Sequence, residues 1–126
     1  MAVVVFLELL TFPFPMILLL RCFAILVLVS MLVVTGWASS VQALWKIPAE
    51  VVQNPWFIAT LFDAYFGFLF FWLWVVYKER GWGTRLGWLV GILLLGNIAM
   101  AIYVLIQTFK VGKEGSIGDL LGRRYV

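Results

Sequence analysis

Asp63 is the only acidic residue within the long hydrophobic stretches of the chain, where it lies in the apolar and aromatic run 55–77. A carboxylate at the centre of a bilayer costs at least about 2.5–3.5 kcal/mol, so such a residue usually has a reason to be there. Three kinds of chemistry are open to it: hydrogen bonding between helices, proton or ligand handling, and contact with another protein. Hydrogen bonding within a helix bundle is the simplest of these, with the carboxyl kept neutral by desolvation.

Helix geometry predicts the partners of this carboxyl. On a helix that begins at Pro55, Asp63 lies about 12 Å from the start, at 1.5 Å per residue. Counted from the ends of their own hydrophobic segments, Ser30 lies about 10 Å deep and Tyr103 about 9 Å deep. Asn97 lies deeper, at about 18 Å. We therefore expect an intramembrane polar cluster of Asp63, Ser30 and Tyr103, with Asn97 about one turn below.

Four glycines are candidates for close helix packing. Gly67 shares a helix face with Asp63, because the two are four residues apart. Gly87 and Gly91 form a pair of small residues at the spacing that lets a neighbouring helix backbone approach. Gly96 directly precedes Asn97 in the third hydrophobic segment. For Gly87 and Gly91, packing inside a helical hairpin is a simpler interpretation than homodimerisation.

Two absences reduce the number of possible functions. The chain has no histidine, which is the commonest metal ligand and general base. Its single cysteine, Cys22, cannot form an internal disulfide, a zinc site or a redox pair. We therefore expect no cofactor and no metal, we name no catalytic residue, and we favour a non-enzymatic role.

The composition predicts an integral membrane protein. Of 126 residues, 65% are hydrophobic and 12% are charged, whereas soluble domains average roughly 45–50% apolar and about 25% charged. So much apolar surface needs lipid as its solvent. The net charge of +3 comes from residues at the segment boundaries and suits anionic headgroups rather than nucleic acid.

Three hydrophobic segments, residues 16–37, 55–77 and 86–109, are long enough to cross a bilayer as helices. Asn54 and Pro55 provide a good N-cap and first residue for the second helix. The polar link 78–85 is short and contains two glycines. The expected fold is all-α, an integral membrane bundle of three transmembrane helices in which helices two and three form a tight antiparallel hairpin.

The chain divides into three parts. Residues 1–15 form an apolar segment that ends in prolines, and we interpret it either as an interfacial segment or as sequence upstream of a true start at Met16. A third interpretation makes 16–40 a cleaved signal peptide, although its apolar region is longer than a typical signal core. Residues 16–109 are the three-helix transmembrane domain. Residues 110–126 are a short polar tail, in which Ser116 and Asp119 are spaced to cap a short helix.

The orientation follows from basic residues. Arg21 and the basic link 78–85 favour the cytoplasmic side for the N-terminus, and three spans then place the C-terminus outside. The basic residues of the tail argue against this orientation. The expected location is the bacterial inner membrane.

Several blocks of sequence resemble a known family. These blocks are residues 30–39, the motifs 54–56 and 59–65, the exit 74–79, and residues 94–103. Together they resemble the domain of unknown function 1475 family, over a region from about residue 20 to the end. The resemblance implies a multi-pass membrane protein and no known activity.

Three functions are consistent with these observations. We favour a structural or accessory subunit whose helices pack against a larger membrane complex or against further copies of the chain. The first alternative is a small transporter or carrier component built on Asp63. The second is a membrane enzyme that acts on a lipid or isoprenoid, with Asp63 as the acid and Tyr103 assisting. The lipid bilayer is the one partner common to all three, and none of them involves nucleic acid.

Overall fold

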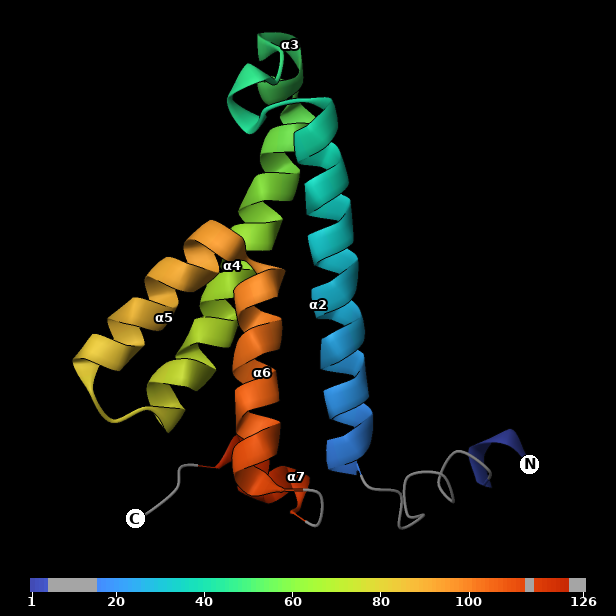
Figure 1. Cartoon of the computed structure of the whole chain (residues 1–126), viewed down its shortest axis with the longest axis vertical. Helices are drawn as coiled ribbons and strands as arrows, with labels where there is room; N and C mark the ends of the chain where they lie inside the picture. The colour runs from blue at the N-terminus through green and yellow to red at the C-terminus, as the bar shows by residue number, and fades with distance from the viewer. Residues whose placement is uncertain (5–15, 113–114, 123–126) are drawn as a thin grey trace.

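The computed structural model describes residues 1–4, 16–112 and 115–122 (Figure 1). The fold is all-α, as predicted, and the described residues contain no strand. In order, the elements are α2 (Met16–Val41), the 3-10 helix η1 (Leu44–Lys46), α3 (Ala49–Val52), α4 (Pro55–Lys78), α5 (Trp82–Leu95), α6 (Asn97–Val111) and α7 (Ile117–Leu121). Of the predicted segment 1–15, residues 5–15 lie outside the described residues.

Two helices, α2 and α4, are long and apolar enough to cross a membrane. At 26 and 24 residues, they measure about 39 and 36 Å at 1.5 Å per residue. The start of α4 is as predicted: the Asn54 side chain accepts a hydrogen bond from the backbone N–H of Trp56 at 2.9 Å, and Pro55 is the first helical residue. Most side chains of both helices are exposed.

The third predicted span, 86–109, is not one helix. It is divided at Gly96, which has φ 56° and ψ −124° and separates α5 of 14 residues from α6 of 15. These helices measure only about 21 and 22 Å. In Figure 1, α5 runs back alongside the second half of α4, and α6 then returns in the opposite direction. The prediction of one continuous helix over residues 86–109 is therefore wrong.

This break changes the arrangement of the helices. The hairpin predicted between two complete spans is not confirmed, because the helix that follows α4 and packs against it, α5, has only 14 residues. The end of α6 lies at the same end of the molecule as the start of α2 and the end of α4 (Figure 1). The expectation that a third span carries the chain to the opposite end of the bundle does not match this arrangement.

The core lies where α4, α5 and α6 meet. Its buried residues are Val75, Ile92, Ala99 and Tyr103, and most of the side chains packed around them are aromatic: Phe68, Phe71, Trp72, Trp74, Trp88 and Met100. Helix α2 packs on the other side of α6, where the small residues Ala24 and Ala101 are both buried. Small side chains at this contact allow the two helix backbones to approach closely.

Candidate functional site

Tyr103 is a polar side chain that is fully buried in α6. Three aromatic rings surround it, each in an edge-to-face arrangement. The ring centroids of Phe71, Trp74 and Trp88 lie 5.8, 5.3 and 4.9 Å from that of Tyr103. We call these three residues the Tyr103 cage. It joins α4 and α5 to α6 through contacts that aromatic pairs favour.

The hydroxyl of Tyr103 donates a hydrogen bond to Oε1 of Glu79 at 3.1 Å. Glu79 is the C-cap of α4, and its own backbone N–H bonds to the carbonyl of Val75 at 2.8 Å. Its carbonyl accepts a bond from Nε of Arg85 at 2.8 Å. Glu79 therefore links the end of α4 to both α5 and α6.

Two side chains of α4 hold the tail helix α7. Lys78 is buried and its Nζ donates to the carbonyl of Leu120, while Nε1 of Trp74 donates to the carbonyl of Leu121 at 3.1 Å. At its other end α7 begins with the capping box predicted from Ser116 and Asp119. The two donors thus satisfy carbonyls that the end of a short helix leaves without partners.

A second polar contact joins α2 to α6. Arg21 donates from Nε to the hydroxyl of Thr108 at 3.4 Å and from Nη2 to its carbonyl at 3.1 Å. The guanidinium also lies 4.1 Å from the centre of the Phe109 ring. Both contacts lie toward the same end of the molecule as Glu79, since they involve the start of α2 and the end of α6.

The predicted polar cluster of Asp63, Ser30, Asn97 and Tyr103 is not joined in the structure. Asp63 and Ser30 are exposed, and Asn97 is the exposed first residue of α6. Among the described residues, no hydrogen bond connects any two of the four, and the Asp63 carboxylate has no hydrogen bond or ion pair at all. The predicted layer assumed three straight helices, and the break at Gly96 instead turns Tyr103 toward the end of α4.

The four glycines also have different surroundings. A Cβ built on Gly96 would lie 2.8 Å from Cζ of Phe68, so this glycine is in close contact with α4. A Cβ on Gly91 would just reach that of Ala99, at 4.0 Å, whereas Gly67 and Gly87 have open space around them. Gly96 and Gly91 therefore pack against a neighbouring helix, while Gly67 and Gly87 face outward.

Sequence reasoning missed the roles of Glu79 and Lys78, which it treated only as part of the polar link 78–85. The available signal was Tyr103: a hydroxyl inside a hydrophobic segment needs a hydrogen-bond partner, and the chain has few acids near segment boundaries. Chemically, the cage holds one phenol bonded to one carboxylate. No group of three His, Cys, Asp or Glu suited to a metal occurs among the residues that the structure describes.

The fold and site define a class: an all-helical protein with two membrane-length helices, in which a buried tyrosine joins α4, α5 and α6. The chain belongs to the family described as "Protein of unknown function (DUF1475)", whose model matches residues 24–125. This confirms the resemblance found in the sequence. No curated protein and no solved structure matches the chain.

Proposed function

We propose that the chain is a membrane-embedded accessory subunit that crosses the bilayer twice, through α2 and α4. The support for this placement is the apolar surface of the two helices. Their exposed side chains include Phe23, Leu26 and Val33 on α2, and Phe62 and Phe70 on α4, all at least 61% exposed. Lipid is the solvent that suits so large an apolar surface.

In this proposal α5 and α6 form a re-entrant hairpin that enters and leaves on one side. Each is too short to cross about 30 Å of hydrocarbon. A break in a helix at membrane depth is tolerated when protein covers it or when it lines a water-filled cavity. Gly96 is buried beneath the Phe68 ring, so the first condition applies.

The basic residues support one orientation. At the end of the molecule where α2 begins and α4 and α6 end lie Arg21, Lys78, Arg80, Arg85 and Lys110. The positive-inside rule assigns this end to the cytoplasm. The N-terminus is then inside, as predicted, and the end of α6 is inside as well. The opposing charge of the tail, which argued against a C-terminus outside, is accounted for.

The main support for the accessory role is the carboxylate of Asp63, which is exposed and has no partner among the described residues. It lies eight residues into α4, between the small residues Ala59 and Gly67 at four-residue spacing, and all three are exposed. Small residues let a second helix approach, and a polar group between them can hydrogen-bond across the contact. We propose that this strip binds a helix of a larger membrane partner that presents a cation or hydrogen-bond donor to Asp63.

A carrier component is the second candidate, because half-helices that meet near the membrane centre are typical of transporters. The α5–α6 break is the feature that favours it. Against it, an apolar ring covers the break. An enzyme that pairs Asp63 with Tyr103 receives less support, since Tyr103 bonds to Glu79 instead.

Affinity purification of the full chain in mild detergent tests the proposal. We expect a stoichiometric membrane partner to co-purify with the wild type and with Asp63→Asn, which keeps a hydrogen-bonding side chain, but not with Asp63→Leu. Ser30→Leu is the matched control, because it removes another exposed polar side chain from the other long helix, and it should retain the partner. Recovery of homo-oligomers alone would favour the carrier, and retention of the partner by Asp63→Leu would refute the role of this strip.

A further inference from the structure

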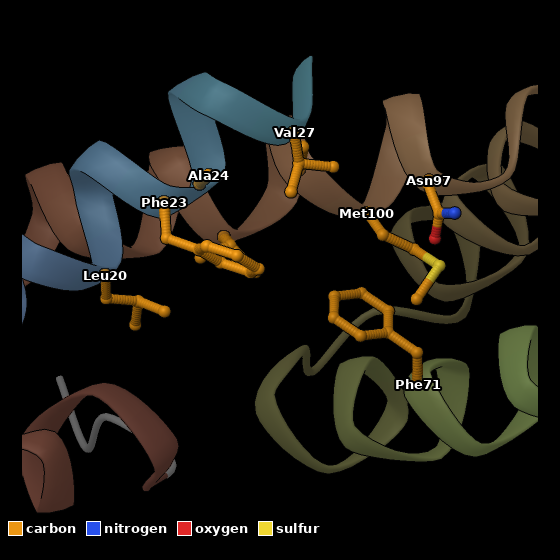
Figure 2. Close-up of a pocket in the computed structure, with 9 residues that line it drawn as sticks. Leu20, Phe23, Ala24, Val27, Phe71, Asn97 and Met100 are labelled. Atoms are coloured by element: carbon orange, nitrogen blue, oxygen red, sulfur yellow. The ribbon is translucent and has the colours of Figure 1, made fainter. Parts of the chain in front are cut away.

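A groove lies on the opposite side of α6 from α5, where α6 faces α2. Its lining comes from α2, α6 and one residue of α4: Leu20, Phe23, Ala24, Val27, Phe71, Asn97, Met100, Ala101 and Val104. Figure 2 shows Val27, Met100 and Phe71 pointing into the same space from three helices. The groove has a volume of about 390 Å³, within the range of about 300–1,000 Å³ that small-molecule sites occupy.

The shape of the groove follows from the helix packing. On α2 its residues recur at Leu20, Phe23 and Val27, which is the spacing of one helix face. Ala24 and Ala101 bring α2 and α6 together at the base of the groove. Helix α4 diverges from α2 toward the end of the molecule at which α2 begins (Figure 1). The result is an apolar groove that runs along the helices. Asn97, the first residue of α6, lies at the end of the groove nearest the Gly96 break.

The cationic side chain of Arg21 lies at the other end of the groove. Arg21 follows Leu20 directly, and it bonds to Thr108, one helical turn beyond Val104 on α6. A guanidinium has five N–H donors, and these two bonds use two of them. Its contact with the Phe109 ring, 4.1 Å from Cζ to the ring centre, also holds the group at this end of α6. The remaining donors can therefore receive a phosphate at the mouth of the groove.

The groove is thus apolar along its length and has a group that can bind an anion, Arg21, at the end near the start of α2. A volume of about 390 Å³ suits a single hydrocarbon chain better than a protein helix, which is about 10–12 Å across with its side chains. We infer that the groove binds one acyl chain of an anionic phospholipid, with Arg21 contacting the phosphate headgroup. Anionic lipids are abundant in the cytoplasmic leaflet. The proposed orientation puts the basic end of the chain on that side.

This inference rests on the membrane placement proposed above but not on the partner of Asp63. Lipid binding and partner capture are measured separately, so the failure of one does not imply the failure of the other. If the chain copurifies with its partner but retains no lipid, only the present inference fails.

Native mass spectrometry of the purified full chain tests it. The protein in mild detergent receives equal amounts of dioleoyl phosphatidylglycerol and dioleoyl phosphatidylcholine, which share their acyl chains. We expect one phosphatidylglycerol to be retained in preference. Arg21→Gln should lower this preference about tenfold, in line with the loss of a charge-assisted hydrogen bond, whereas Arg21→Lys should keep most of it. Lys110→Gln, which removes an exposed cation at the same end, is the matched control and should have no effect.

The groove itself is tested by filling it. Val27→Phe should abolish retention of the lipid, while Val29→Phe, an equal change on an exposed part of α2 outside the groove lining, should not. If Val27→Phe does not purify as a single species, Met100→Phe fills the same space from α6. Inorganic phosphate at millimolar concentration should not displace the lipid. Equal retention of the two lipids, equal effects of Val27→Phe and Val29→Phe, or displacement by phosphate would each overturn the inference.

Discussion

At the scale of single residues, burial decides which polar groups have partners inside the chain. Tyr103 is fully buried, and its hydroxyl bonds to Glu79. Asp63 is exposed on α4 and has no partner among the described residues. In a membrane, both groups need a hydrogen bond. The first has it within the chain, and we propose that the second finds it in another protein.

The hydrogen bond of Tyr103 gives a first prediction. Tyr103→Phe keeps the ring in its cage but removes the donor to Glu79, so it should lower the free energy of unfolding by about 1–3 kcal/mol. Tyr65→Phe is the control, because Tyr65 is exposed and its bond to the carbonyl of Leu93 is long, at 3.4 Å. Denaturant titration in detergent micelles measures both variants. Equal effects would show that the Glu79 contact contributes little.

The structure also changes the expectation for Asp63→Leu. A carboxyl that joined helices within the bundle would make this variant about 0.5–1.7 kcal/mol less stable. Because Asp63 has no bond to another described residue, we expect the isolated chain to be at least as stable as the wild type in micelles. The same titration checks this, with Asp63→Asn as the isosteric control. A clear loss of stability specific to Leu would show that the carboxyl does have a partner within the chain.

The sequence identified Asp63 as exceptional but could not identify its surroundings. Depth along a helix can be counted from residue numbers, so a layer containing Asp63, Ser30 and Tyr103 was a reasonable prediction. Which face of a helix meets which neighbour depends on the tertiary packing. The bond between Tyr103 and Glu79 joins residues 24 positions apart, and it forms only because α6 turns back toward the end of α4.

At the scale of elements, Gly96 divides one hydrophobic segment into two helices. Its φ of 56° belongs to a backbone region that residues with a Cβ rarely adopt. The Phe68 ring occupies the space that such a Cβ would need. No proline marks this break, and the hydropathy continues through it, so the sequence alone predicted a continuous helix. The N-cap of α4 and the capping box of α7 were predictable because their signals are local.

Substitution of Gly96 tests the break. Gly96→Ala should destabilise the protein by at least about 1–3 kcal/mol through backbone strain, with a further cost from the contact with Phe68. Combining it with Phe68→Leu should relieve the contact but not the strain, and so restore stability only in part. Gly87→Ala is the matched control, because a Cβ there meets no atom within 4 Å. Thermal unfolding in micelles ranks the variants, and a neutral Gly96→Ala would contradict the conformation of the turn.

The attachment of α7 gives a prediction at the same scale. Lys78→Met keeps the aliphatic stem but removes the donor to the carbonyl of Leu120, so α7 should detach more often. Hydrogen exchange of residues 117–121 should then become faster, because the bonds that hold the helix end are fewer. Lys110→Met, at an exposed position, should leave the exchange rate of α7 unchanged. An unchanged rate in Lys78→Met would show that the other contacts of α7 are sufficient.

At the scale of the whole molecule, the broken third segment accounts for the distribution of charge. With three spans, the basic residues of the link 78–85 and those near the end of α6 lie on opposite sides of the membrane, which the positive-inside rule disfavours. With two spans and a re-entrant hairpin, these groups share one side, together with Arg21 at the start of α2. The break at Gly96 therefore removes the conflict between the basic tail and the basic link, which a three-span arrangement places on opposite sides.

The side of the membrane on which each link lies tests this account most directly. In a Cys22→Ser background, single cysteines are introduced into the full chain by Gln42→Cys, Arg80→Cys and Ser116→Cys. Each is labelled in intact cells and in lysed cells with a maleimide that does not cross membranes. The account predicts that Arg80→Cys and Ser116→Cys are both protected in intact cells, while Gln42→Cys is labelled. Labelling of Ser116→Cys together with Gln42→Cys, with Arg80→Cys alone protected, would restore the three-span arrangement and contradict the re-entrant hairpin.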